Sequence, residues 1–147
     1  MGNRISASLR RLVESRAGRV CEYCLIHADD VFVGCQVDHI ISEKHGGPTA
    51  AENLAYACSY CNRQKGSDVG SIEKVTGQFI RLFNPRTDSW RDHFRLVGVR
   101  IEWRTPIGEA TVRVLKLNEA LRVEERETLK RHGKYPSPAA MQRIGKS

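Results

Sequence analysis

The sequence predicts an α+β fold in which short strands and helices are built around clustered cysteines. Apolar residues recur at strand spacing in some segments and at helical spacing in others, and two Cys-x-x-Cys pairs enclose a strand–turn–strand pattern. The 147 residues suffice for one compact domain. We therefore expect a small module bracketed by the two cysteine pairs, with an N-terminal helix before it and a C-terminal β/α extension after it.

The segment 5–16 is predicted to form the N-terminal helix. Its apolar residues Ile5, Leu9, Leu12 and Val13 fall at helical spacing, and arginines lie between them. The basic face that results suits contact with phosphates and exposure to solvent equally well.

Four of the five cysteines form the pairs Cys21 with Cys24 and Cys58 with Cys61. In a reducing compartment such cysteines stay as thiols, and four thiolates are the tetrahedral ligand set that Zn²⁺ prefers. A redox dithiol is the alternative for one pair, but two pairs favour a structural zinc. The 33 residues between Cys24 and Cys58 exceed the gap of about 15–20 residues in zinc ribbons. We therefore expect this insert to carry the function.

The residues between and after the two pairs predict the order strand, connection, strand, helix. Residues 31–41 are rich in β-branched and apolar residues, and a glycine-proline break at 46–48 follows them. A short helical turn over 49–52, a second strand over 53–57 and a helix over 59–66 complete the module.

Asp38 and His39 lie in the first of these strands and are candidates for catalysis. Because adjacent residues of a strand point to opposite faces, the two side chains are expected to have different roles. Hydrolysis of a phosphodiester needs a base for water and a hard cation on the phosphate oxygens. The His39 imidazole can accept a proton near neutral pH, and the oxygens of Asp38 and Asn62 suit Mg²⁺ or Mn²⁺. The alternative for Asn62 is a helix cap.

The charge of the chain favours a polyanionic partner. The 24 Lys and Arg residues outnumber the 17 Asp and Glu residues, and the net charge of +7 fits binding to DNA. No apolar run has the length that crosses a bilayer, and residues 1–19 lack the continuous apolar core of a secretion signal. We therefore expect a cytoplasmic protein with no membrane partner.

The cysteine-bracketed segment resembles the HNH endonucleases, which have the ββα-metal fold. The resemblance covers residues 19–67 and rests on the motifs Asp38-His39-Ile40-Ile41, His45-Gly46-Gly47, Asn53-Leu54 and Cys61-Asn62-Arg63-Gln64-Lys65-Gly66. It implies that His39 is the general base and that Asn53 orients the loop of this base, although Asn53 is also typical of a turn. Asp38 and Asn62 would bind the catalytic Mg²⁺ or Mn²⁺, which in the family stabilises the pentacovalent phosphate. Asn62 stands where other members have His.

These observations predict a metal-dependent endonuclease that nicks or cuts DNA. The alternative is a non-catalytic, zinc-stabilised module that binds nucleic acid. His45, Arg63 and Lys65 are candidates for contacts with the DNA backbone, and exposure to solvent alone is the alternative for each. A monomer and a homodimer are both compatible with the sequence.

After the module, which covers residues 1–68, the chain lacks cysteine. It is predicted to form a β/α extension over 69–132. One strand is expected over 79–83, and another over 97–103, where apolar and polar residues alternate. Helices are expected from Thr105-Pro106, which has the cap-plus-proline pattern of a helix start, and over about 118–131. Residues 133–147 are expected to form a flexible tail.

The extension is similar to a tail found on some bacterial, especially cyanobacterial, HNH proteins. The matching motifs are Leu82-Phe83-Asn84-Pro85-Arg86, Trp90, His93-Phe94 and Thr105-Pro106-Ile107-Gly108. Six arginines and two tryptophans alternate along it: Arg81, Arg86, Trp90, Arg91, Arg95, Arg100, Trp103 and Arg104. They suit a surface for the phosphate backbone or, equally, a packing layer with a charged outer face.

Overall fold

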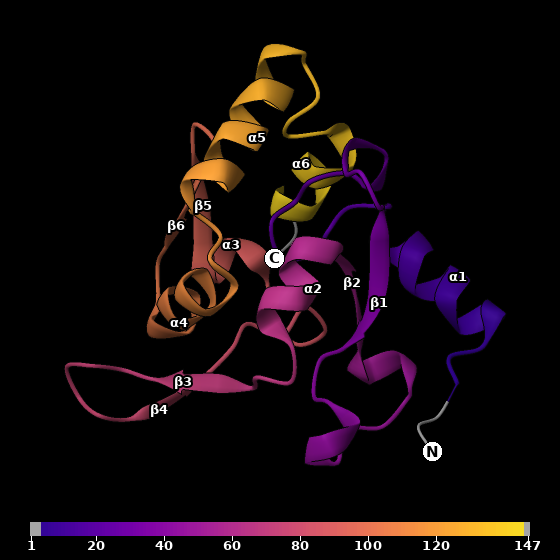
Figure 1. The fold of residues 1–147 in the computed structure, drawn as a ribbon, viewed down its shortest axis with the longest axis vertical. Helices are drawn as coiled ribbons and strands as arrows, with labels where there is room; N and C mark the ends of the chain where they lie inside the picture. The colour runs from indigo at the N-terminus through magenta and orange to yellow at the C-terminus, as the bar shows by residue number, and fades with distance from the viewer. Residues whose placement is uncertain (1–3, 146–147) are drawn as a thin grey trace.

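The computed structural model describes residues 4–145. Within this range the chain forms three two-stranded antiparallel sheets and six α-helices, so the predicted α+β class is confirmed. Figure 1 shows a central hairpin with one helix on each side of it, and the C-terminal half of the chain stacked beyond the second of these helices. No helix in the described range is both long and apolar enough to cross a membrane.

The central hairpin joins β1 (Cys35–His39) to β2 (Leu54–Cys58), and α2 (Ser59–Lys65) follows at once. All five residues of β2 are buried, because α1 lies on one side of the hairpin and α2 on the other. The predicted order of strand, connection, strand and helix is therefore present, although β1 is shorter than the segment 31–41 that the composition indicated.

The ends of α2 follow from the local sequence. The Cys58 side chain caps the N-terminus by accepting a hydrogen bond from the Cys61 amide, and Gly66 ends the helix with a positive φ of 52°. Two 3-10 turns shape the connection between β1 and β2, η2 (Glu43–His45) and η3 (Ala51–Asn53). The second cysteine pair therefore lies at the start of a helix whose two ends are set by Cys58 and Gly66.

The predicted N-terminal helix is α1 (Ala7–Arg16). Ser6 caps it by accepting a hydrogen bond from the Leu9 amide. Val13 is fully buried and packs with Leu54 and other residues of the hairpin in a small second core. This core lies on the face of the hairpin that α2 does not cover.

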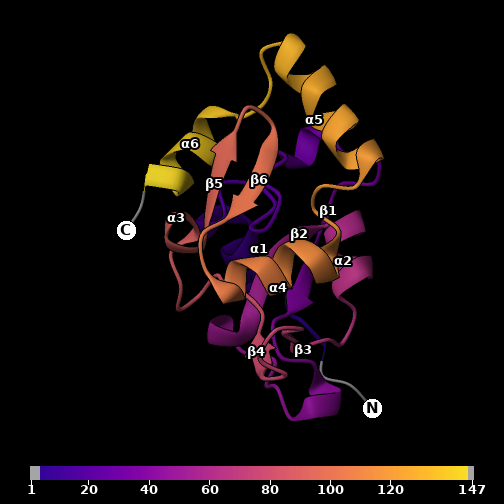
Figure 2. The same cartoon turned by 90° about the vertical axis from the view of Figure 1, so that its left-hand side faces the viewer.

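The C-terminal half is an extension of two hairpins and four helices. Its elements are β3 (Gly70–Ile72), β4 (Phe79–Arg81), α3 (Trp90–His93), β5 (Phe94–Val97), β6 (Arg100–Trp103), α4 (Pro106–Leu115), α5 (Ala120–Arg131) and α6 (Pro138–Gly145). The prediction of one strand over 97–103 is wrong, because Gly98 adopts a φ of 63° and turns the chain between β5 and β6. Figure 2 shows this hairpin above α4, with which β6 is in contact.

One apolar core joins the extension to the cysteine-bearing module. It contains the aromatic residues Tyr23, Phe83, Trp90 and Phe94, whose rings meet mainly edge to face. The Trp90 indole N–H donates a hydrogen bond to the Tyr23 carbonyl at 3.0 Å. The extension therefore packs directly on the turn that carries the first cysteine pair.

The predicted flexible tail is wrong for its described part, residues 133–145. Tyr135 and Ala140 are buried in the main core, and residues 138–145 form α6. The Tyr135 hydroxyl donates a hydrogen bond to the Cys24 carbonyl at 2.8 Å. A composition rich in proline and polar residues suggested disorder, but a few apolar side chains reach a core built elsewhere in the chain. Residues 146 and 147 lie outside the described range.

Candidate active site and zinc centre

The four paired cysteines converge on one point. Their sulfur atoms all lie within 4.8 Å of one another, and the Sγ atoms of Cys24 and Cys58 are 3.7 Å apart. A tetrahedral Zn²⁺ with Zn–S bonds of about 2.3 Å needs sulfur atoms about 3.8 Å apart. The amides of Cys24 and Cys61 point at Cys21 Sγ and Cys58 Sγ, at 3.5 and 3.4 Å. The cluster is therefore able to hold a zinc ion.

The charge of the cluster also favours a cation. All four cysteines are buried, and burial raises the pKa of the Cys21 thiol, because the surrounding medium disfavours a thiolate. Hydrogen bonds from the other three cysteines, with a contribution from the charge of Arg122, lower the pKa of Cys58. Four thiolates in so small a volume repel one another unless a metal ion lies between them.

Arg122 of α5 reaches this centre from the extension. It is 5% exposed, and its Nη2 lies 3.0 Å from Cys24 Sγ and 3.5 Å from Cys58 Sγ. The guanidinium also stacks on the Tyr60 ring, 4.4 Å from the centroid, and pairs with Glu125 at 2.9 Å. A zinc ion with four thiolates carries a net charge of −2, so a buried arginine on the sulfur atoms offsets part of that charge.

Replacing Arg122 by methionine is expected to weaken zinc binding by about 10–100-fold, the usual effect of losing an outer partner of a metal ligand. Methionine keeps much of the side-chain volume, so the change removes mainly the charge and the N–H groups. Transfer of zinc to a coloured chelator measures the effect. Arg131→Met, at the exposed end of α5, is the matched control. Equal rates of zinc transfer from the two variants would contradict a role of Arg122 at the centre.

The faces of β1 separate the two candidate catalytic residues. Cys35 and Val37 pack towards α1, whereas Gln36 and Asp38 contact residues of α2. His39 lies at the end of the strand, opposite Leu54 in the register. Asp38 is turned into the hairpin–helix interface, whereas the His39 ring contacts Thr49, so the two side chains have different surroundings.

Lys65 holds the end of β1 from within the protein. Its ammonium lies 3.0 Å from Asp38 Oδ2 and donates a hydrogen bond of 2.9 Å to the His39 carbonyl. Burial raises the pKa of Asp38, and the Lys65 charge opposes that shift. Lys65 is 2% exposed, so the prediction that it contacts the DNA backbone is wrong. It instead positions the strand that carries both candidate residues.

The His39 imidazole is held by a chain of hydrogen bonds. The Thr49 hydroxyl donates its proton to Glu43 Oε1 at 3.0 Å, and the same hydroxyl lies 2.8 Å from His39 Nε2. Because a hydroxyl has one proton, Thr49 must accept from His39, and Nε2 must carry the hydrogen. The neutral ring then has its lone pair on Nδ1. Thr49 and Glu43 therefore select the tautomer of His39.

Asn53 fastens the connection that follows His39. Its Oδ1 accepts a hydrogen bond from the Ile41 amide at 2.9 Å, and its Nδ2 donates to the carbonyls of Ile41 and Pro48, both at 2.8 Å. Gly47 is required in this connection, because a Cβ atom there would lie 1.7 Å from the Ile41 carbonyl oxygen. The Asn53 side chain thus closes the loop that carries Thr49.

The donor chemistry of Asp38 and Asn62 suits a hard divalent cation. Asn62 lies in the first turn of α2, one turn before Lys65, and its Nδ2 donates to Gln36 Oε1 at 2.5 Å. This bond leaves the Asn62 amide oxygen available to a cation. The Asp38 Oδ2 atom is buried and receives no well-aligned hydrogen bond, although the Lys65 ammonium is close. A metal at Asp38 would have to share the carboxylate with Lys65.

The remaining candidates for DNA contact lie on the surface. His45 is exposed at the end of η2, and Arg63 is exposed on α2 above the Tyr60 ring. Both are accessible to a polyanion. In the extension, Trp90 is buried and Trp103 is 54% exposed, so the alternating arginine–tryptophan pattern does not form a single surface.

Three side chains that contact the candidate residues were not predicted from the sequence. The sequence indicates only a short helical turn around Thr49 and a helix around Arg122, and no pattern singles out Glu43. A local pattern of this kind indicates backbone conformation and says nothing of what the Thr49 hydroxyl contacts. No local signal marks Arg122, because α5 buries two of its three arginines, Arg122 and Arg126, while Leu121 is 79% exposed.

The fold and the site define a ββα module in which four cysteines, able to hold a metal ion, cluster at the start of its helix. Comparison with known proteins then gives the family: residues 21–68 match the family model described as HNH endonuclease, so this part of the chain is an HNH domain. The resemblance that the motifs indicated is confirmed. No curated protein and no solved structure matches the chain.

Proposed function

We propose that this protein is a metal-dependent DNA endonuclease of the HNH class, with His39 as the general base and a structural zinc on the four cysteines. The observation that carries the proposal is the chain from Glu43 through Thr49 to His39 Nε2, which leaves the Nδ1 lone pair to accept a proton. A base that activates water needs a free lone pair on the imidazole, and this arrangement supplies one at Nδ1.

In this proposal His39 Nδ1 takes a proton from the attacking water. Asn53 keeps the base loop closed through its three hydrogen bonds, so that Thr49 stays against the imidazole. Asp38 and Asn62 would hold the Mg²⁺ or Mn²⁺ ion, which as a Lewis acid neutralises charge on the phosphate. Arg63 and His45, both exposed, are proposed to contact the DNA backbone.

The ion pair between Asp38 and Lys65 supports the competing function, a zinc-stabilised module that binds nucleic acid without cutting it. A carboxylate that is already neutralised at 3.0 Å is a weaker ligand for a divalent cation. This alternative keeps the HNH domain and its charge but assigns no chemistry to His39. The two functions therefore differ in whether added metal produces cleavage.

Incubation of supercoiled plasmid with the zinc-loaded protein distinguishes them. Added Mg²⁺ or Mn²⁺ is expected to convert supercoiled DNA to nicked or linear DNA, and removal of that metal by dialysis is expected to stop the reaction. The thiolate-bound zinc should remain during dialysis, because soft thiolates hold Zn²⁺ far more tightly than Asp and Asn oxygens hold Mg²⁺. DNA binding without cleavage at any metal concentration would establish the non-catalytic module instead.

A further inference from the structure

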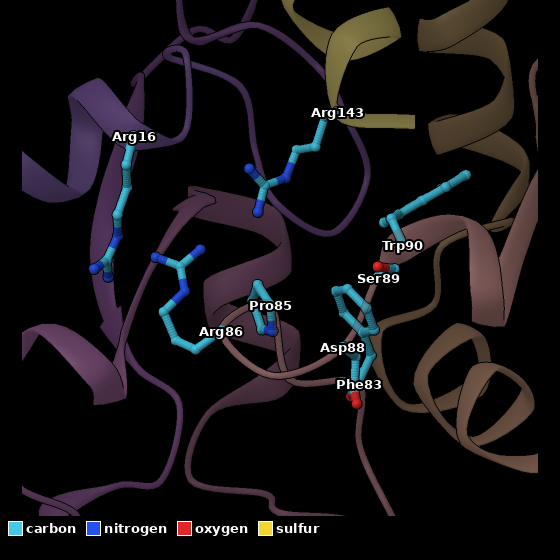
Figure 3. Close-up of a pocket in the computed structure, with 8 residues that line it drawn as sticks. All are labelled: Arg16, Phe83, Pro85, Arg86, Asp88, Ser89, Trp90 and Arg143. Carbon is cyan, nitrogen blue, oxygen red and sulfur yellow. The ribbon is translucent and has the colours of Figure 1, made fainter. Parts of the chain in front are cut away.

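A second charged centre lies outside the HNH domain's candidate active site. The cavity shown in Figure 3 has a volume of about 340 Å³ and is lined by arginines from three distant segments, Arg16 of α1, Arg86 of the loop before α3, and Arg143 of α6. The guanidinium groups of Arg86 and Arg143 lie near each other, and Arg16 lies beside Arg86 (Figure 3). Tertiary structure alone brings these three cations together.

One buried carboxylate serves two of the three arginines. Glu22 is fully buried between the first two zinc-site cysteines, and its Oε2 accepts hydrogen bonds from both Arg86 and Arg143. Its Oε1 accepts a hydrogen bond from the Tyr56 amide at 2.9 Å, so the carboxylate is fully engaged. Arg16 uses its Nη2 on the carbonyls of Ala51 and Leu54. Glu22 matches one of the three cations, so two positive charges are left without a carboxylate from the other described residues that bond these arginines.

The acidic residue among those that line the cavity does not supply the missing charge. Asp88 receives two hydrogen bonds from Arg81, at 2.7 and 2.9 Å, and one from the Asn84 amide. Arg86 Nη1 and Arg16 Nε are buried and have no hydrogen-bond partner in the described part of the chain. Buried guanidinium N–H groups without an acceptor are costly, and an anion that supplies acceptors removes that cost.

The electrostatics agree with an excess of positive charge. Burial lowers the pKa of Arg16 and of Arg143, and the charge of Arg86 lowers both further. Glu22 opposes these shifts without cancelling them. An arginine in this setting keeps its proton, so the shifts mean that each guanidinium is in an environment that an oxyanion would stabilise.

We infer that this cavity is a binding site for a phosphate-type oxyanion, held by Arg16, Arg86 and Arg143. Guanidinium forks match the geometry of phosphate oxygens, and the cavity lies beside β2, where Arg16 contacts the carbonyl of Leu54, the strand partner of His39. The phosphate can come from the DNA backbone or from a small phosphorylated molecule. The inference rests on the proposed function only if the bound phosphate belongs to DNA.

The test measures thermal unfolding of the full-length, zinc-loaded protein in sodium phosphate and in sodium chloride of equal ionic strength, without added Mg²⁺. Phosphate is expected to raise the Tm of the wild type by about 3 °C or more once it exceeds the dissociation constant roughly tenfold. Arg86→Gln and Arg143→Gln should lose this phosphate-specific shift. Arg95→Gln, an exposed arginine of β5 outside the cavity, should keep it.

Glu22→Gln is expected to change the phosphate-induced rise in Tm in the opposite direction from the arginine variants. Glutamine keeps an oxygen acceptor for the Tyr56 amide but no longer neutralises Arg86 and Arg143. Phosphate should therefore bind more tightly to Glu22→Gln than to the wild type and raise its Tm by more, provided that circular dichroism in phosphate-free buffer shows a folded protein. A purely structural salt-bridge cluster predicts destabilisation of all three cavity variants with no change in their response to phosphate.

The source of the phosphate is read from DNA binding in Mg²⁺-free buffer. If Arg86→Gln lowers the slope of log K against log [salt] by about 0.9, the site takes a phosphate of the DNA backbone. An unchanged slope together with a lost phosphate shift assigns the site to a small phosphorylated ligand. A phosphate shift that is absent in the wild type, or retained in both Arg86→Gln and Arg143→Gln, overturns the inference. The plasmid assay does not affect this result, so failure of the proposed nuclease activity is seen separately.

Discussion

His39→Ala is expected to lower the rate of DNA cleavage by roughly 10²–10⁴-fold, the usual contribution of a positioned general base. The side chain is half-buried at the end of β1 and its ring contact is with the Thr49 hydroxyl, so its removal creates no cavity in either apolar core. The stability of the protein should therefore change little. Single-turnover cleavage of a labelled duplex, beside a thermal melt of the same sample, measures both quantities.

Two further variants decide whether the effect belongs to the base. His132→Ala removes an exposed histidine at the end of α5, outside the candidate site, and should leave the cleavage rate unchanged. Thr49→Val removes the hydroxyl that sets the His39 tautomer but keeps the side-chain shape, and an intermediate loss is expected. If His39→Ala cut DNA at the wild-type rate, the assignment of the base would be wrong. If Thr49→Val had no effect, the proposed tautomer selection would be wrong.

Cys58→Ser is expected to abolish stoichiometric zinc binding and to unfold the hairpin at room temperature. Cys58 supplies a sulfur to the metal centre, caps α2 and receives the Arg122 guanidinium, so one substitution disturbs all three. Structural zinc sites contribute about 10–16 kcal/mol of apparent binding free energy. The whole stability of a small domain is only about 5–15 kcal/mol.

The fifth cysteine provides the matched control for that experiment. Cys35 pairs with Cys58 in the register of the hairpin but lies outside the sulfur cluster. Cys35→Ser should therefore retain one zinc per chain and a cooperative melt. Metal analysis by mass spectrometry and circular dichroism distinguish the variants. Full zinc occupancy and an unchanged melt in Cys58→Ser would show that the cluster is not a structural zinc site.

Features that depend on neighbouring residues could be predicted from the sequence. The spacing of the cysteine pairs indicated the metal centre, and the motif around Asp38 and His39 indicated the HNH domain. The cap-plus-proline pattern at Thr105 predicted the start of α4, where the Thr105 hydroxyl accepts a hydrogen bond from the Gly108 amide. Each Cys-x-x-Cys pair and the Thr105 cap depend on covalent geometry and on hydrogen bonds that span only a few residues. The two cysteine pairs meet only because the chain between them folds back as a hairpin.

The sequence predictions were wrong for residues whose contacts come from distant parts of the chain. Lysine is usually a surface residue, but β1 covers Lys65 and provides both oxygen atoms that its ammonium contacts. The segment after residue 132 has the composition of a disordered tail, but the Tyr135 hydroxyl finds the Cys24 carbonyl across 111 positions. No sequence window contains both partners of such a contact.

The sequence by itself therefore determined the class of the protein: an α+β chain with an HNH module built on four cysteines and a histidine in its first strand. Only the tertiary structure decided how that module is completed, through Thr49 and Glu43 at the imidazole, Arg122 at the sulfur atoms, and three arginines around Glu22. The physical reason is that local spacing fixes which ligands can meet within one turn or hairpin. Burial and charge pairing depend on which distant segments pack together, and that is settled only when the apolar core forms.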